Sequence, residues 1–499
     1  MATNLDDCRV TDLLLRGARV VDPETGLDAV RHVGVTGDKI TSVSVEPAPA
    51  RRELDLSGRV LAPGFIDLHS HAQTVSSLRM QALDGVTTAL ELESGAAPVR
   101  ATYDRASDEG RPINFGYSAS WAMARMRVLD GAEPDGGFES FAALCGGVRW
   151  RDPATPAELD RVVAELEGQL HQGALGIGVL LGYAPQTGRK EYFQVARLAA
   201  RYDVPTFTHA RFKNPDDPET ALEGIAEVVA AASGTGAHMH LCHINSTSLR
   251  AIDEVGAVVT GAREHGLRVS TEAYPYGAGM TTIGVPFLHP GNLARVGITP
   301  SDLVLLSTGE RPRDAARLTE IQRTDPGAMV AIHYLDEDDP ADWSVLERAL
   351  LLPDTAIASD AIPFATPDGN LVADAWPLPA DAMSHPRTSG TFCRFLGAMV
   401  RESGLLTLIE AVRRCTLQPA EVMSAVAPQF RRKGRVQVGA DADLVVFDLD
   451  AVSDRSTYAE PGLASAGVDH LLVGGEFVVR GGEPLPEARP GRAVKGRLG

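Results

Sequence analysis

The 499-residue sequence predicts a (β/α)₈ barrel that carries a small β-domain built from both ends of the chain. In the middle of the chain, eight short apolar segments alternate with stretches of helical periodicity, as repeated βα units do. At each end, strand-like segments alternate with turn residues. A doubly wound parallel sheet is the alternative fold, but no glycine-rich nucleotide-binding loop joins a strand-like segment to a helix.

The two chain ends, residues 1–63 and 428–499, are predicted to form one β-domain. In the first part, turn signals such as Asp22-Pro23 separate β-rich runs. In the second part, Gly474-Gly475 predicts a hairpin turn. The strands expected in this domain cover residues 13–21, 31–35, 39–45, 53–55, 60–62, 442–448, 470–473 and 476–479.

Residues 64–427 are predicted to form the barrel. The segment around 285–328 is longer than an ordinary βα loop and is therefore expected to be an insertion. Helices are expected at 156–171, 191–202, 218–233 and 248–265. The eight expected barrel strands cover residues 64–66, 87–93, 113–120, 175–181, 205–209, 237–244, 268–274 and 356–360.

The composition excludes several classes of partner. Lys and Arg number 47 against 66 Asp and Glu, so the net charge is −19, and aromatic residues make up 5%. Binding to nucleic acid or to an anionic membrane needs clustered cations, and base stacking needs aromatic side chains, so neither partner is expected. The five cysteines are scattered, which is typical of a reduced protein. With no signal peptide and no apolar run of about 18 residues, the cytoplasm is the expected location.

The strongest chemical signal is the segment PGFIDLHSH at 63–71. His69 and His71 are two positions apart, so their side chains point to the same side of an extended strand. Imidazole nitrogens are common zinc ligands, and the chemistry of barrel enzymes gathers where the strands end. The segment therefore predicts half of a metal site.

Later barrel strands also end in residues of the metal-ligand type. His209 closes the fifth expected strand, His243 the sixth and Asp360 the last. His238 and His240 compete with His243 for the same role, and His243 is preferred because it stands at the carboxyl end of its strand. A carboxylate at the position of Asp360 can accept a proton from a water that a metal activates.

The second expected barrel strand contains two glutamates, Glu91 and Glu93, inside an apolar run. Both side chains face the same side of the strand. Two buried carboxylates are costly unless a cation or a proton neutralises them, and a metal shared with His69 and His71 would do so. The alternative is that this face of the strand reaches solvent.

Along nearly its whole length, the sequence resembles the amidohydrolase superfamily, and within it the N-acyl-D-amino-acid deacylase (D-aminoacylase) branch. The matching motifs are GFIDLHSH at 64–71, EAYPYGAG at 272–279, HPRTSGTF at 385–392 and VGADADLVVFD at 438–448. The resemblance implies a (β/α)₈ barrel with a small β-sandwich, and one or two Zn²⁺ ions at the strand ends. The residues that it assigns to the metal are His69, His71, His209 and His243, and it makes Asp360 both a metal ligand and the catalytic aspartate.

The sequence departs from this branch at one metal position. The branch has a metal-binding cysteine after a Gly-Val-Thr-Thr segment, and no cysteine stands there in this sequence. Glu93 or Ser94 falls at that place, depending on a one-residue gap. Because a carboxylate is a plausible zinc ligand and a hydroxyl a poor one, Glu93 is the predicted ligand, with Glu91 as the second choice.

The predicted substrate pocket departs further. Asn245 stands where the branch has a lysine, and Met280 where it has a serine, whereas Arg387 is kept. An arginine fork suits a substrate carboxylate, although Arg387 has a structural ion pair as its alternative role. Tyr274 or Tyr276 would donate a hydrogen bond to the oxyanion that forms on the substrate. The alternative is that both tyrosines only pack against their neighbours. The lost polar contacts weaken the expectation of specificity for D-amino acids.

The predicted function is metal-dependent hydrolysis of a C–N amide bond, other than a peptide bond, in a small molecule that carries a carboxylate. One alternative is a cyclic amide hydrolase similar to dihydroorotase or hydantoinase. Those relatives commonly use a carboxylated lysine on the fourth strand, and residues 174–181 contain none. The other alternative is a non-catalytic metal-binding barrel, which the retention of His69, His71 and Asp360 argues against. A homo-oligomer is left open.

Overall fold

Eight parallel strands form the centre of the molecule. The computed structural model describes residues 10–499, and its central strands lie side by side in the order of the sequence. A parallel bridge between Ser70 and Ala361, just beyond the first and last strands, nearly closes the barrel. The barrel prediction is confirmed, and the doubly wound alternative is wrong because its strand order would reverse within the sheet. The strands are β6 (Phe65–Asp67), β7 (Val86–Ala96), β8 (Asn114–Ser120), β9 (Ile177–Leu180), β10 (Pro205–His209), β11 (His238–Leu241), β12 (Val269–Ala273) and β16 (Thr355–Ile357).

Two of these strands end three residues earlier than the sequence predicts. β11 ends at Leu241, although a strand was expected to 244, and β16 ends at Ile357, although a strand was expected to 360. The reason is the backbone of His243 and of Asp360, which have φ angles of 29° and 52°. An extended strand cannot contain such left-handed residues, so both side chains stand on turns just past the strand ends.

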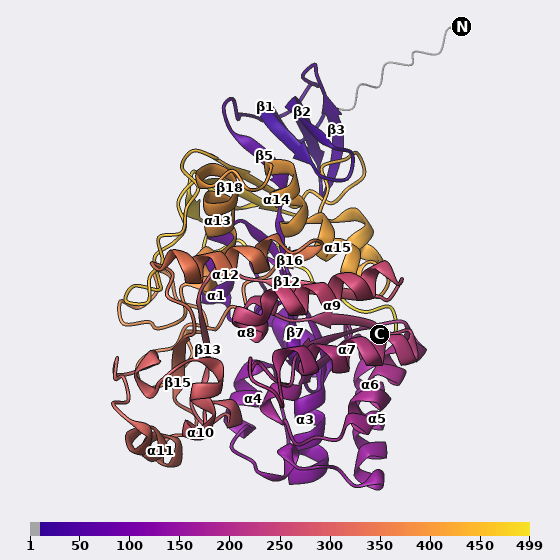
Figure 1. The fold of residues 1–499 in the computed structure, drawn as a ribbon. Coiled ribbons are helices and arrows are strands. Elements are labelled where there is room, and N and C mark those ends of the chain that lie inside the picture. The colour runs from indigo at the N-terminus through magenta and orange to yellow at the C-terminus, as the bar shows by residue number, and fades with distance from the viewer. Residues whose placement is uncertain (1–9) are drawn as a thin grey trace, which may run out of the picture.

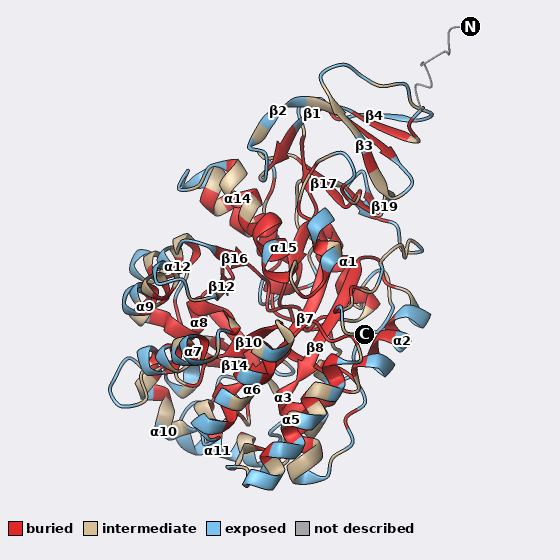
Figure 2. Ribbon diagram, turned by 90° about the vertical axis from the view of Figure 1, so that its right-hand side faces the viewer, coloured by how far each residue is buried: buried red, intermediate tan, exposed pale blue. Residues whose placement is uncertain are grey.

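The helices cover the barrel from outside. Figure 2 shows the central strands as buried, while helices such as α5 have exposed outer faces. The sequence marks the start of α5 clearly, because Thr155 and Glu158 form a reciprocal capping pair around Pro156. Among residues 10–499, no helix is both long enough and apolar enough to cross a membrane. The helices are α1 (Val75–Leu83), α2 (Val99–Glu109), α3 (Trp121–Arg125), α4 (Phe138–Leu144), α5 (Pro156–Leu170), α6 (Arg189–Tyr202), α7 (Ala221–Thr235), α8 (Ile244–Ser248), α9 (Ile252–Glu264), α12 (Pro340–Leu351), α13 (Arg387–Leu396), α14 (Leu408–Cys415) and α15 (Leu417–Met423).

A separate sheet of nine strands is made from both ends of the chain (Figure 1). Its N-terminal and C-terminal parts join where β5 pairs with β17 in antiparallel register. Along β17, Val445 and Phe447 belong to the large hydrophobic core, whereas Leu444 and Val446 belong to a smaller core within the sheet. Successive side chains of β17 therefore point to opposite faces of the sheet. One face packs against the barrel, and the other packs within the β-domain itself. The strands are β1 (Leu13–Asp22), β2 (Leu27–Thr36), β3 (Lys39–Ser44), β4 (Glu53–Asp55), β5 (Val60–Pro63), β17 (Leu444–Phe447), β18 (Val468–Val473), β19 (Glu476–Arg480) and β20 (Glu483–Pro484).

This sheet agrees with the expectation that both chain ends build one β-rich unit. Gly474 and Gly475 make the turn between β18 and β19, with φ angles of 55° and 80°. The exact division of the chain into 1–63 with 428–499, and 64–427, stays a prediction. Residues 1–9 lie outside the described part.

A small antiparallel sheet projects from the barrel between β12 and β16, together with α10 and α11 (Figure 1). The insertion expected around 285–328 falls between the first and last strands of this sheet. The sheet and the insertion reach back to the barrel mouth, where Gly279, Met280, Thr281, Phe287 and Ile332 line a pocket. The elements are β13 (Ala278–Thr282), α10 (Pro290–Leu293), β14 (Leu303–Leu305), α11 (Ala315–Thr324) and β15 (Met329–His333).

Candidate active site

A buried aspartate fixes the loop that follows the first barrel strand. The Asp67 carboxylate accepts the backbone N–H of His69 at 3.1 Å, that of Ser359 at 3.0 Å and the side-chain amide of Gln81 at 2.8 Å. Burial raises the pKa of Asp67 to about 6, although the hydrogen bonds from Ser359 and His69 oppose the rise. Asp67 thus ties the loop that carries His69 to the segment that leads into Asp360.

His69 and His71 face each other at the end of this first strand. Their Nε2 atoms are 3.1 Å apart. The Nδ1 atom of His69 is 2.6 Å from Glu272, and that of His71 is 2.8 Å from Glu91. A carboxylate neighbour favours a hydrogen on Nδ1, which leaves the two Nε2 lone pairs facing each other unless a proton or a metal ion lies there. Accordingly, burial would lower the pKa of His71, but Glu91 helps to raise it to about 9.

His209 and His243 form a second pair at the ends of β10 and β11. The Nε2 atom of His243 is 3.0 Å from Nδ1 of His209. One oxygen of Glu93 is 2.8 Å from His243 and 3.1 Å from His209. The other oxygen is 3.4 Å from Nε2 of His69. One carboxylate therefore faces both histidine pairs.

Asp360 completes the group. One carboxylate oxygen is 3.4 Å from Nε2 of both His69 and His71. The other is 2.9 Å from the Arg387 guanidinium, which also donates from Nε to the Asp360 backbone carbonyl at 2.6 Å. Burial would raise the pKa of Asp360, but Arg387 and His69 hold it well below its usual range. Asp360 is therefore ionised, and Arg387 fixes the orientation of its carboxylate.

The donor atoms in this region suit a divalent metal such as zinc. Burial would raise the pKa of Glu93, but the neighbouring histidines lower it well below its usual range, so the carboxylate is available as a ligand. The Nε2 atom of His209 is buried and has no hydrogen-bond partner within residues 10–499. Imidazole, carboxylate and thiolate are the groups that zinc binds. Three sets of donors have all their atoms within 4.8 Å of one another: His69, His71 and Glu93; Glu93, His209 and His243; and His69, Cys242 and Glu272.

The structure separates the three residues that compete for the position of the missing cysteine. Glu93 lies between the histidine pairs. Glu91 lies behind His71, and its carboxylate also accepts the backbone N–H groups of Ser94 and Gly95 at 3.2 and 3.3 Å. The Ser94 hydroxyl is 3.4 Å from Nδ1 of His71, on the side away from the facing Nε2 atoms. Metal binding by Glu93 stays a prediction, and its position agrees with that role.

Of the four residues predicted to contact the substrate, Tyr274 lines the pocket over the histidines. The Asn245 side chain accepts a hydrogen bond from the backbone N–H of Tyr274 at 3.2 Å and so helps to position Tyr274. The Tyr276 hydroxyl donates to Asp454 at 3.3 Å. The Arg387 guanidinium lies 4.8 Å from the centre of the Tyr274 ring, in addition to its contacts with Asp360. Substrate contact by these residues stays a prediction.

The pocket itself is bounded on one side by the strand ends and on the other by aromatic side chains. Phe287 comes from the insertion and Tyr334 directly follows β15, so the small antiparallel sheet and its insertion together supply one wall. The Tyr183 hydroxyl bonds Thr281 of β13 at 2.9 Å, which ties this wall to the barrel. The remaining lining residues include Phe138, Ser246, Gly279, Met280, Ile332 and Ile362.

Sequence reasoning missed three residues of this region. Glu272 bonds His69 at 2.6 Å and His240 at 2.9 Å, so it links two histidines. It is the one acid of the buried strand β12, a signal of the same kind as the glutamates of β7. Cys242 lies beside His69 in a potential donor set. Lys213, in the loop after β10, lines the pocket, and its loop carries no periodic pattern that would have marked it.

Comparison with known proteins gives full-length similarities. The model of the amidohydrolase family matches residues 52–243 and 135–479. The N-acyl-D-glutamate deacylase of Alcaligenes xylosoxydans xylosoxydans is 31% identical, over 97% of this chain and 96% of its own length. The D-aminoacylase of the same organism is 26% identical, over 94% of each chain. The crystal structure of N-acyl-D-glutamate deacylase from Bordetella bronchiseptica, with zinc and a phosphonate inhibitor, superposes with a TM-score of 0.78 at 26% identity, covering 98% of this chain and 100% of that one.

Proposed function

The chain belongs to the amidohydrolase family, and from this premise we propose that it is a zinc-dependent deacylase acting on an N-acyl amino acid. Hydrolysis of a non-peptide C–N bond follows from its membership of the deacylase branch. The observation that carries the proposal is the position of Glu93 between two histidine pairs, with Asp360 beside one of them. The full-length similarity to the two deacylases supports an acylated amino acid, and hence a substrate with a carboxylate.

The metal site would use side chains that the barrel strands bring together. When bound, zinc supplies a nucleophilic water at neutral pH and polarises the carbonyl of the scissile amide. Because Glu93 faces both histidine pairs, the same side chains would hold one ion or two. Glu272 and Glu91 would orient the first pair by accepting the Nδ1 hydrogens. The proposed ligands are His69, His71, Glu93, His209, His243 and Asp360.

Asp360 would move the proton of the reaction. Its ionised carboxylate can take a proton from the attacking water and return it to the leaving nitrogen. The Arg387 guanidinium holds Asp360 in place, because it contacts both the carboxylate and the backbone carbonyl of that residue. Tyr274, which lines the pocket, would donate to the oxygen of the scissile carbonyl.

The proposed location is the cytoplasm. Cys145, Cys242, Cys393 and Cys415 are free, buried thiols, as is usual in a reducing compartment. Cys8 lies outside the described residues. A homo-oligomer stays an open prediction.

The test is a screen of the zinc-loaded protein with N-acyl-D-amino acids, N-acyl-L-amino acids and cyclic amides such as hydantoins. We expect release of free amino acid from one of the two acyl series. A chelator should abolish this release and added zinc should restore it.

Turnover of cyclic amides alone would instead favour the hydantoinase-like alternative, although β9 contains no lysine to be carboxylated. Zinc binding without turnover of any of these compounds would favour the non-catalytic alternative.

A further inference from the structure

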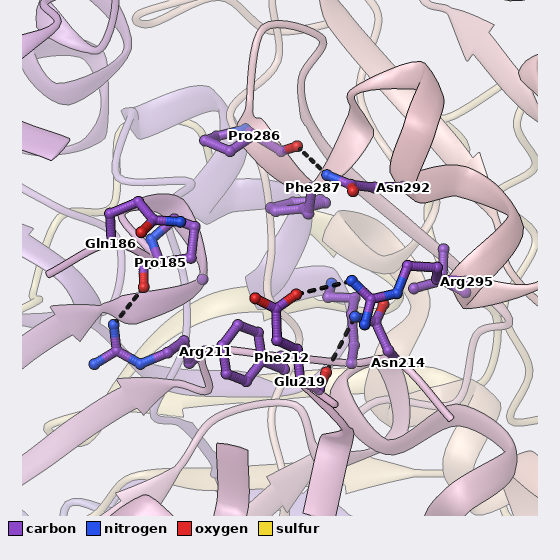
Figure 3. Close-up of a pocket in the computed structure, with 13 residues that line it drawn as sticks. Pro185, Gln186, Arg211, Phe212, Asn214, Glu219, Pro286, Phe287, Asn292 and Arg295 are labelled. Carbon is purple, nitrogen blue, oxygen red and sulfur yellow. Dashed lines mark hydrogen bonds and ion pairs between the residues drawn. The ribbon is translucent and has the colours of Figure 1, made fainter. Parts of the chain in front are cut away.

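Lys213 enters the pocket from the loop after β10, and its side chain is buried, with 7% of its surface exposed. It lines the pocket over the histidines and also an adjoining cavity of about 180 Å³, which Figure 3 shows. The Nζ atom lies 4.5 Å from the centre of the Phe287 ring and 5.1 Å from that of Tyr334. It donates to the Tyr334 hydroxyl at 3.3 Å. The ammonium group is therefore held between two rings at the boundary of two cavities.

The other cations around the adjoining cavity are neutralised by acids. Arg211 makes two bonds of 2.7 Å to Glu227. Arg295 lies 2.8 Å from Glu219, as the dashed line in Figure 3 marks. For Lys213, no carboxylate oxygen in the described part of the chain lies within 4.0 Å. Lys213 is thus the cation in this region whose nearest polar partner is a neutral hydroxyl.

A buried ammonium group without a carboxylate partner is unfavourable for folding. Burial lowers the pKa of Lys213 to about 8, while Glu93 and Asp360 at the strand ends oppose this shift. The group is still mainly charged at neutral pH. A charge kept at this cost inside a pocket is typical of a residue that meets a ligand of opposite charge.

The residues expected to bind the substrate's carboxylate already contact other groups. Arg387 faces Asp360 through Nε and one terminal nitrogen, while its other terminal nitrogen has no hydrogen-bond partner among residues 10–499. Asn245 accepts the backbone N–H of Tyr274. We propose that Lys213 binds the carboxylate of the substrate, as the specificity-determining cation of this pocket. The proposal rests on the proposed function, since it names the group that recognises the carboxylate of an N-acyl amino acid. The chain would thus present its cation from the loop after the fifth barrel strand rather than after the sixth.

The test compares an N-acyl amino acid with its carboxamide, which has the same acyl group and side chain but no negative charge. For the wild-type protein we expect a KM for the acid that is lower by roughly 10- to 100-fold, because a charge-assisted bond is lost with the carboxamide. Lys213→Met should remove this preference by raising the KM of the acid alone, with kcat and zinc content unchanged. Lys213→Arg should keep most of the preference. Lys190→Met, at an exposed position, is the matched control and should change nothing.

The outcomes separate this proposal from the one on which it rests. If the wild-type protein hydrolyses no N-acyl amino acid, the proposed function fails. If it hydrolyses acid and carboxamide with equal KM, the role of Lys213 is overturned, and this measurement needs no variant. An equal rise in KM for both substrates in Lys213→Met would also overturn it, because a merely structural lysine would act in that way.

Discussion

The floor and the wall of the pocket neutralise their charges differently. The floor, which we define as His69, His71, Glu93, His209, His243 and Asp360, stands at the ends of barrel strands, and its carboxylates face histidines or Arg387. The wall, which we define as Lys213, Phe287 and Tyr334, stands on the loop after β10, on the insertion and directly after β15. Its one cation contacts a hydroxyl and two rings. The difference indicates a division of labour, in which the rigid strands carry the chemistry and the variable segments choose the substrate. Changes in the floor should therefore lower kcat or zinc content, and changes in the wall should alter KM.

The largest effect is expected for Asp360→Asn. An amide cannot accept the proton of the attacking water, so kcat should fall by roughly 10²- to 10⁴-fold. The measurement is steady-state kinetics on a substrate found in the screen, together with zinc analysis of the purified variant. Near-normal turnover would show that another group moves the proton.

A smaller loss is expected for Glu93→Ala. This change removes the carboxylate that faces both histidine pairs. Zinc content should fall, and turnover with it by at least the roughly 10- to 100-fold that loss of an outer partner of a metal site costs. Ser94→Ala is the matched control, because Ser94 competes for the same position, and it should leave the zinc content unchanged. Normal zinc in Glu93→Ala with a deficit in Ser94→Ala would reverse the assignment.

The smallest effect is expected in the wall, for Tyr334→Phe. The variant keeps the ring beside Lys213 and removes the hydroxyl that accepts its hydrogen bond. The KM for the acid substrate should rise by roughly 2- to 10-fold, with kcat and zinc content unchanged. A fall in kcat at normal zinc content would place Tyr334 among the groups that act on the reacting bond, and would remove the distinction between floor and wall.

The sequence predicts the eight barrel strands because each is an apolar run between helical stretches. It also predicts that side chains of the metal-ligand type lie close together, because they stand at the carboxyl ends of those strands. It does not predict where β11 and β16 end, since the left-handed backbone of His243 and Asp360 depends on tertiary contacts. It favours Glu93 over Ser94 on ligand chemistry alone, because a one-residue gap exchanges the two positions. Only the packing of β7 fixes which side chain faces the histidines. Lys213 lies on an irregular loop. Such a loop has no helical or strand periodicity and no motif from which the orientation of a side chain could be predicted.

The pairing of β5 with β17 affects the order in which this protein matures. A single glycine, Gly64, joins β5 to the strand that leads to His69, and its N–H donates to the Asp443 carbonyl at 2.9 Å. A Cβ at Gly64 would lie 2.1 Å from the Thr87 side chain, so the chain passes closely over the second barrel strand at this point. β5 and the first barrel strand are made early during translation, whereas β17, the partner of β5, lies near the C-terminal end. β6 can pair with β7 once both have been made, but the pairing of β5 with β17 forms only after the C-terminal segment has emerged from the ribosome.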